Sequence, residues 1–360
     1  MDGNSQSMEV MSNFDLKRYL YMTTSGINDS KLYLSEMKSI FGNKFNKPNF
    51  ILDKYIEPSR SVYIRGYIDV LFESESISEI VKNIENANLS YEKYKIKFIK
   101  SDEKIEYSEW ITALKDLGTS IIGEFSLHNP ETELALIRND NLWVFGLHYR
   151  NKDKWKNRRL KPYNYSHALD VKLAKSILNI AIKNDFSLKI IDPCCGIGTV
   201  VIEALAMGLD IEGYDINKVV VDHANSNLEH LGFKGIIKNM NMHDINKKYD
   251  IAVLDIPYGQ FTSTTHEVQI LLISKTRQIS KKAIIISMID MSEDIIHSGF
   301  TIVDKIILNK TNGFSRYITV CNWIGVNFMF SPFFMFKIYQ MLKKRMSGLW
   351  SIIKGVIISI

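Results

Sequence analysis

The sequence predicts an α/β protein whose carboxyl-terminal part is a doubly wound, mostly parallel sheet of seven strands. From residue 168 to 321, short apolar segments of strand length alternate with segments of helical length. This alternation is typical of a parallel sheet with helices on both faces. The last two expected strands, 301–308 and 317–321, are joined by a short turn that contains glycine. They predict a closing hairpin, with the last strand antiparallel.

The individual elements follow from apolar periodicity. In the carboxyl-terminal part, a helix is expected over 168–183, and five parallel strands are expected at 188–191, 211–214, 235–238, 251–254 and 283–288. Residues 16–150 mix the two patterns and predict a smaller α+β region. Its expected helices are 30–41, 77–87 and 108–117, and its expected strands are 17–23, 61–72, 95–100, 133–138 and 142–148.

Composition permits a soluble protein of two or three domains. The chain has 360 residues and a net charge of +5, which allows an anionic partner without requiring one. Its three cysteines show no metal-ligand spacing and fit a reducing compartment. The first 15 residues lack the pattern of a signal peptide and are expected to be a disordered lead. We therefore expect a cytoplasmic protein without a metal.

Residues 322–360 form an apolar and basic extension with two interpretations. The stretch 323–342 is about as long as a membrane span, but a proline and several polar residues interrupt it. It is either a tail anchor or membrane-surface segment, or an amphipathic extension or read-through past the normal stop. The interrupted hydropathy favours the second interpretation, so a membrane partner is not expected.

A basic linker is expected at 151–165, between the two regions. Residues 151–161 contain six basic residues, one acidic residue and Trp155. Charge runs are usually solvated, which makes a plain linker one interpretation. Contact with nucleic-acid phosphates, with the tryptophan stacking on a base, is the other.

The first expected strand of the sheet ends in the loop Asp192-Pro-Cys-Cys-Gly-Ile-Gly198, followed by Thr199 and a helix. In doubly wound sheets, ligands bind beyond the carboxyl ends of the strands, where the strand order reverses. Gly196 and Gly198 would let the backbone approach such a ligand closely. A Gly-x-Gly turn alone is weak evidence, because nicotinamide enzymes use a similar one.

Acidic residues after three consecutive strands help to distinguish between a nicotinamide dinucleotide and another nucleotide-like ligand. Asp192 would repel a pyrophosphate but suits the ammonium and sulfonium of S-adenosyl-L-methionine. Asp215 can accept hydrogen bonds from both ribose hydroxyls, and Asp244 can bind the adenine amino group. The sequence thus predicts S-adenosyl-L-methionine as the cofactor. The expected binding residues are Asp192, Cys194, Gly196, Gly198, Thr199, Asp215, Ile216 and Asp244.

The fourth strand runs into Asp255-Ile-Pro-Tyr-Gly259, which resembles the (D/N/S)-P-P-(Y/F) motif of enzymes that methylate exocyclic amino groups of nucleobases. Such an amine is a poor nucleophile, because its lone pair is delocalised into the ring. We assign Asp255 and the Ile256 carbonyl to holding the amine, and Pro257 to stiffening the turn. Tyr258 is expected to stack on a base taken out of its helix. Ile256 replaces the first proline of the motif, so we expect a less constrained turn.

The two cysteines of the loop are expected to be small packing residues. Methyltransferases that attack a pyrimidine ring use a cysteine in a later motif, and residues 255–259 contain none. Neither a nucleophile nor a metal ligand is therefore expected at Cys194 or Cys195.

Several stretches together resemble the tRNA guanine-N2 methyltransferases that act on guanosine ten, and their bacterial relatives. The similar stretches are 162–180, 192–208, 213–232 and 249–259, and residues 123–146 look like the end of a THUMP domain, a tRNA-binding module. The resemblance covers residues 16–321. It implies a class I (Rossmann-like) S-adenosylmethionine-dependent methyltransferase domain over 166–321, with tRNA as substrate and N2-methylguanine as product.

Two other functions stay open at this point. The motif at 255–259 also permits an adenine-N6 methyltransferase that acts on DNA or another RNA, although the THUMP-like segment argues against it. The second is a tRNA-binding protein that has lost catalysis, for which Ile256 is the only support.

Overall fold

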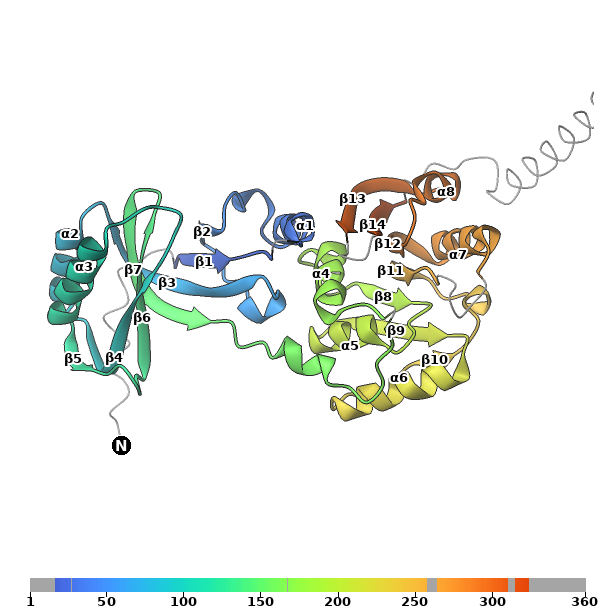
Figure 1. The fold of residues 1–360 in the computed structure, drawn as a ribbon, viewed down its shortest axis with the longest axis horizontal. Coiled ribbons are helices and arrows are strands. Elements are labelled where there is room, and N and C mark those ends of the chain that lie inside the picture. Colours follow the sequence, from blue (N-terminus) through green and yellow to red (C-terminus); the bar gives the residue numbers. More distant parts are fainter. Residues whose placement is uncertain (1–16, 27, 167, 258–263, 310–314, 324–360) are drawn as a thin grey trace, which may run out of the picture. The chain divides into compact units, whose positions relative to one another are not determined.

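The structure is a computed structural model that describes residues 17–26, 28–166, 168–257, 264–309 and 315–323. It divides into two compact units, Met1–Asn157 and Arg158–Ile360 (Figure 1). Tyr258, the expected lead 1–15 and nearly all of the 322–360 extension lie outside the described residues. Within the described residues, no helix combines the length and the apolar character needed to span a bilayer.

The first unit contains a seven-stranded sheet in the order β2-β1-β3-β7-β6-β4-β5. Neighbouring strands are antiparallel, except that β4 runs parallel to both β5 and β6. The strands are β1 (Tyr19–Thr23), β2 (Asn49–Leu52), β3 (Ile64–Ser74), β4 (Ser90–Ile99), β5 (Ile122–Phe125), β6 (Thr132–Asn139) and β7 (Leu142–Arg150). This is the α+β region that the sequence predicts, with two additional strands, β2 and β5.

Three helices cover parts of this sheet: α1 (Ser30–Phe41), α2 (Ile77–Asn86) and α3 (Tyr107–Ser120). Helix α2 begins at the N-cap Ser76, whose hydroxyl accepts the N–H of Glu79 at 3.3 Å. It buries Ile80 and Ile84, four residues apart on one face, in a core shared with α3 and the strands β4, β6 and β7. Helix α1 contributes Met37 to a separate core with β1 and β2.

The second unit contains a seven-stranded sheet in the order β10-β9-β8-β11-β12-β14-β13. Strands β8 to β12 pair in parallel, and β14 is antiparallel to both β12 and β13. The predicted doubly wound sheet with an antiparallel last strand is confirmed. The strands are β8 (Lys189–Asp192), β9 (Asp210–Asp215), β10 (Lys238–Asn239), β11 (Tyr249–Asp255), β12 (Ser280–Ser287), β13 (Thr301–Asn309) and β14 (Ser315–Asn322).

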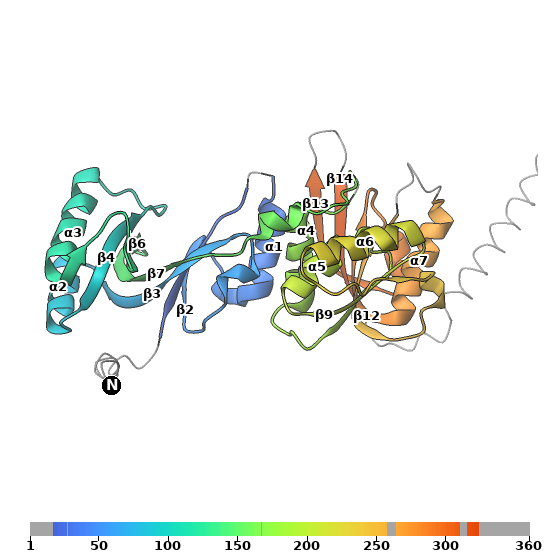
Figure 2. The same cartoon turned by 90° about the horizontal axis from the view of Figure 1, so that it is seen from below.

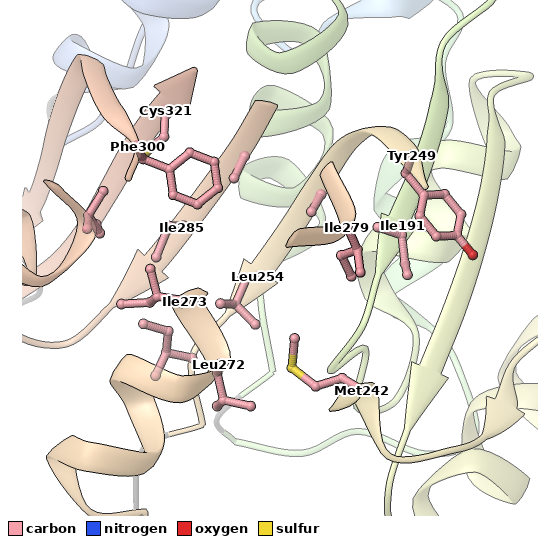
Figure 3. Packing of buried hydrophobic residues seen from close by; sticks show 14 of the residues in the cluster. Ile191, Met242, Tyr249, Leu254, Leu272, Ile273, Ile279, Ile285, Phe300 and Cys321 are labelled. Carbon is pink, nitrogen blue, oxygen red and sulfur yellow. The ribbon is translucent and has the colours of Figure 1, made fainter. Parts of the chain in front are cut away.

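Helices cover both faces of this sheet (Figures 1 and 2). On one face, Leu254 and Ile285 pack against Leu272 and Ile273 of helix α7, as Figure 3 shows. The alternate residues of the same strands are also buried, as expected for a parallel sheet between two helical layers. The helices are α4 (Val171–Ile182), α5 (Thr199–Ala206), α6 (Lys218–His230), α7 (His266–Ile279) and α8 (Ser292–His297).

The third predicted strand, 235–238, is shifted and shortened to β10, Lys238–Asn239. The side-chain amide of Asn225 accounts for this difference. It donates to the carbonyl of Ile237 at 3.0 Å and accepts the N–H of the same residue at 3.0 Å. Because both backbone groups of Ile237 are bound by a side chain, they are not available to a strand ladder.

The expected linker is divided between the two units. Asn151 donates to the carbonyls of Pro58, Ser61 and Ile64 in the first unit, at 2.8 to 2.9 Å. Trp155 packs against the core that contains Tyr21 and Met37. From Arg158 onward the chain belongs to the second unit. Because Trp155 packs against this core, its presence in the segment is explained without a stacked base.

Gly213 in β9 leaves no room for a side chain. A Cβ atom there would approach Val201 Cγ2 to 2.8 Å and Ile237 Cγ1 to 3.0 Å. We expect Gly213→Ala to lower the free energy of unfolding by about 1–3 kcal/mol in a chemical denaturation experiment. Gly118→Ala in α3 is the matched control, since its Cβ would meet nothing within 4 Å. The control should gain about 0.5–1 kcal/mol, and equal effects of the two changes would contradict the packing described.

Candidate functional site

The carboxyl ends of three neighbouring strands bring three predicted acids to one edge of the second sheet. Strand β8 ends at Asp192, β9 ends at Asp215, and β11 ends at Asp255. Strand β8 lies between the other two, with β9 on one side and β11 on the other, so the strand order reverses there. Ligands of doubly wound sheets bind at such a position.

The loop after β8 is held by hydrogen bonds to these acids. The N–H of Cys194 donates to Asp192 Oδ1 at 3.4 Å, and the N–H of Gly196 donates to Asp215 Oδ2 at 3.0 Å. The other oxygen of Asp215 accepts the N–H of Asn217 at 2.9 Å. The carboxylate of Asp215 therefore joins the loop after β8 to the loop after β9.

Both glycines of the loop have backbone angles that disfavour other residues. Gly196 has φ +53° and Gly198 has φ +81°. Gly198 is also the N-cap of α5, where a Cβ atom would come within 2.9 Å of Ile237 Cδ1. The chain can therefore turn sharply from β8 into α5, and Cys194 and Gly196 remain partly accessible in the loop.

The site concentrates negative charge in a poorly solvated place. Burial raises the pKa of Asp192 well above its usual value, and the nearby Asp255 and Asp215 raise it further, against the Cys194 N–H. Burial also raises the pKa of Asp215, although the N–H groups of Asn217 and Gly196 oppose this shift. A positively charged ligand would stabilise the ionised form of these carboxylates.

Cys195 lies in the core, and Cys194 packs against its edge. Burial is the largest cause that raises the pKa of both thiols, and the neighbouring acids add to it. Cys195 is buried, and Cys194 Sγ lies 3.7 Å from Met242 Sδ at the edge of the core. A protonated thiol is a poor nucleophile. Among the residues that the structure describes, no group of three His, Cys, Asp or Glu side chains is arranged to hold a metal ion.

Three further residues of the predicted cofactor set, Ile216, Asp244 and Thr199, do not lie at the end of a strand. Ile216 follows Asp215 directly and has 69% of its surface exposed. Asp244 is exposed at the end of a 3-10 helix, Met242–Asp244, after β10. Thr199 is buried at the first position of α5, where its hydroxyl accepts from Lys161. The first two are accessible to a ligand, whereas Thr199 already has a partner.

Contacts outside the motif hold the peptides at Ile256 and Pro257, directly after β11. The N–H of Ile256 donates to the carbonyl of Ile286 at 2.9 Å and continues the pairing with β12 by one residue. A proline could not make this bond. The Ile256 side chain is buried in the core, and the carbonyl of Pro257 accepts from the Thr264 hydroxyl at 2.8 Å. These contacts restrain the peptides next to Ile256, and the sequence analysis did not include them.

A buried acid on α5 binds the segment that precedes the second sheet, and this contact was not expected. Arg158 donates to Glu203 through Nε at 2.6 Å and Nη2 at 2.9 Å. Glu203 is completely buried. It is the single charged residue in the apolar helix sequence TVVIEALA, which is a signal for a buried cation partner. The sequence placed Arg158 in a linker or phosphate contact instead.

A buried asparagine on α6 makes a second unexpected link to the cofactor loop. Asn227 donates to the carbonyls of Tyr163, at 3.0 Å, and Ile197, at 3.2 Å. It also accepts the N–H of Tyr163 at 2.9 Å. The segment around Tyr163 is thereby fixed beside the loop between Gly196 and Gly198.

Residues 158–289 match a methyltransferase family model. The family is described as "RMKL-like, methyltransferase domain". The matched segment contains the loop at 192–198 and all four acids, Asp192, Asp215, Asp244 and Asp255. The fold and the chemical character of the site therefore agree with the family that this segment matches.

Two curated relatives are similar over parts of the chain, and both are named tRNA (guanine(10)-N2)-dimethyltransferase. The protein of Methanothermobacter thermautotrophicus is 34% identical over 110 residues, which are 30% of this chain and 32% of the relative. That of Pyrococcus abyssi is 32% identical over 151 residues, 39% of this chain and 44% of the relative. The chain thus spans less than half the length of each of these two relatives.

A solved structure, TrmN from Thermus thermophilus, aligns with 85% of this chain and 99% of its own. The sequence identity is 13% and the TM-score is 0.44.

The raised pKa of Asp192 predicts a stability cost at neutral pH. The folded state holds the proton more tightly than the unfolded chain, so ionisation of Asp192 lowers stability as the pH rises. Asp192→Asn should therefore raise the Tm of the ligand-free protein at pH 7 to 8, by about 2–4 °C for each kcal/mol gained. The gain should shrink at lower pH, where Asp192 is protonated.

The control is Asp250→Asn at the opposite edge of the sheet. Asp250 accepts the N–H of Lys189 at 3.1 Å, and this hydrogen bond lowers its pKa. Its neutralisation should lower the Tm. A decrease of the Tm for Asp192→Asn at neutral pH would contradict the proposed electrostatics of the site.

Proposed function

We propose that this protein transfers a methyl group from S-adenosyl-L-methionine to the exocyclic amino group of a nucleobase in RNA, namely N2 of a guanosine in tRNA. The observation that carries the proposal is the meeting of Asp192, Asp215 and Asp255 at one sheet edge. That edge lies within the segment that matches the methyltransferase family. The names of the similar curated relatives support guanosine in tRNA as the substrate.

The residues present fit this cofactor. Its sulfonium and ammonium groups are cations, and the edge of the sheet holds carboxylates whose charges are poorly solvated. Asp215 is proposed to accept the ribose hydroxyls, and Ile216 and Asp244, which are exposed, are proposed to contact the adenine. When bound, the cofactor supplies the electrophilic methyl group.

The turn after β11 would hold the amine. The hydrogen bond from Ile256 N–H to Ile286 fixes the peptide after Asp255, and the Pro257 carbonyl is already bound by Thr264. Asp255 and the Ile256 carbonyl are then the acceptors for the two amino hydrogens. A fixed pair of acceptors would orient the nitrogen lone pair toward the methyl group, and such positioning supplies a large part of the rate in a direct transfer. Tyr258 is proposed to stack on the base.

The test is methyl transfer from labelled cofactor to bulk tRNA, followed by nucleoside analysis. Label in N2-methylguanosine or its dimethyl form supports the proposal. Label in adenosine would favour an adenine-N6 methyltransferase instead. Cofactor binding without transfer to any nucleic acid would indicate a tRNA-binding protein that has lost catalysis.

Substitutions at two strand ends should separate catalysis from cofactor binding. Asp255→Ala removes one acceptor of the amine and should lower kcat at least ~100-fold, with the cofactor Kd nearly unchanged. Asp215→Ala should raise the cofactor Kd about 10-fold or more, because charged hydrogen-bond partners are lost. Asp222→Ala is the control, since Asp222 is exposed on α6 and pairs with Lys218. Near-normal turnover of Asp255→Ala would contradict the catalytic assignment.

Contacts within the chain favour some of the basic residues between 152 and 161 over others as partners for RNA phosphates. Arg158, Arg159 and Lys161 are bound to Glu203, Asp170 and Thr199. Lys152, Lys154 and Lys156 are exposed. We therefore assign the phosphate contact to these three lysines.

Replacing Lys152, Lys154 and Lys156 together by Ala should weaken tRNA binding and reduce the slope of log K against log salt. Each lost phosphate contact contributes about 0.7–0.9 to that slope. The control triple variant replaces Lys189, Lys248 and Lys281, which are exposed at the amino ends of β8, β11 and β12. The same loss of charge there should leave the slope almost unchanged. Equal slopes for the two triple variants would indicate that residues 152–156 are a plain linker without phosphate contacts.

A further inference from the structure

Lys161 is a buried cation beside the loop that is proposed to bind the cofactor. Its side chain has 7% of its surface exposed, and Nζ donates to Thr199 Oγ1 at 2.7 Å. Thr199 is the first residue of α5 and follows Gly198 directly. Asn227 holds the neighbouring Tyr163 against the carbonyl of Ile197. Two independent contacts thus place the segment 161–163 along the loop.

The acids near Lys161 have other partners. Glu203 binds the guanidinium of Arg158 through both carboxylate oxygens. Asp170 binds Arg159 at 2.7 and 2.9 Å. The hydrogen bond of the Lys161 ammonium is to an uncharged hydroxyl, that of Thr199. Glu203 and Asp170 act on the Lys161 ammonium through their charge.

Burial of the Lys161 ammonium is unfavourable unless an anion compensates its charge. Burial lowers the pKa of Lys161 to about 8, although Glu203 and Asp170 act in the opposite direction. An ammonium group carries three N–H donors, and Thr199 accepts one of them. The amino end of α5 adds the partial positive charge of backbone N–H groups that lack partners within the helix. Lys161 and this helix end together favour a carboxylate.

S-adenosyl-L-methionine carries a carboxylate on its methionine end, in addition to its cations. The charged residues expected to bind the cofactor, Asp192, Asp215 and Asp244, are all acidic and would repel that group. We propose that Lys161 binds the methionine carboxylate of the cofactor at the amino end of α5. This proposal rests on the proposed function, because it assumes the cofactor. Lys161 would then bind the cofactor. The sequence analysis instead considered it as one of the basic residues that contact nucleic-acid phosphates.

The test compares two ligands by isothermal titration calorimetry: S-adenosylmethionine and its decarboxylated analogue, which keeps the adenosine and the sulfonium. Wild type should prefer the ligand that has the carboxylate. Lys161→Met should weaken binding of S-adenosylmethionine about 10- to 100-fold, since a charged hydrogen bond is lost. Binding of the decarboxylated analogue should change less than about 3-fold. Lys161→Gln keeps a donor for Thr199 without the charge and should lose the preference in the same way.

Lys282→Met is the matched control. Lys282 is also partly buried, donates to the backbone carbonyl of Ala181, and has its pKa lowered to about 8 by burial. It should leave both affinities within about 3-fold of wild type. Equal weakening of both ligands by both Lys161 substitutions, or no weakening by either, would overturn the carboxylate assignment. If wild type bound neither ligand, the proposed function itself would fall, so the two failures are distinguishable.

Discussion

The buried carboxylate of Asp192 lies at the carboxyl end of strand β8, between the ends of β9 and β11. Its burial, and the charges of Asp255 and Asp215 nearby, make the ligand-free site electrostatically unfavourable. The rest of the site is built around this constraint. The loop turns over it on two glycines with positive φ, and Asp215 fastens that loop to the next strand. A protein gains nothing in stability from such an arrangement, which is a reason to regard it as a binding site for a cationic ligand.

The segment before the second sheet has a structural role in this arrangement. Arg158 neutralises Glu203 inside α5, and Lys161 binds Thr199 at the start of the same helix. Asn227 adds a third contact, between Tyr163 and Ile197. The loop is therefore restrained from the side of the preceding segment as well as from the strands. Acids from the strand ends and a cation from this segment would suit a ligand that carries both signs of charge.

Much of the second unit could be predicted from the sequence, because its buried strands and amphipathic helices have clear apolar patterns. The order of elements and the positions of Asp192, Asp215 and Asp255 at strand ends followed from that pattern. Strand β5 could not be predicted, since its four residues are all exposed and show no alternation. The bounds of β10 depend on the Asn225 side chain, which is distant from it in sequence. Secondary-structure propensities carry no information about such tertiary contacts.

The charged residues of 158–161 were the least predictable part of the site. A run of basic residues indicates solvation or phosphate binding, and nothing local shows that Arg158 meets Glu203, 45 residues later. Likewise, Ile256 looked like a weakened motif, whereas its N–H extends the pairing with β12. In both cases the tertiary partner decides the role of the residue.

A crystal structure of the protein with S-adenosylhomocysteine would test most directly whether the cofactor binds at the ends of β8, β9 and β11. We expect the ribose hydroxyls to bind the carboxylate of Asp215, the adenine amino group to lie at Asp244, and the sulfur to face Asp255. Density for the ligand away from the ends of β8, β9 and β11, or a bound ligand that leaves Asp215 without a ribose contact, would contradict the central claim.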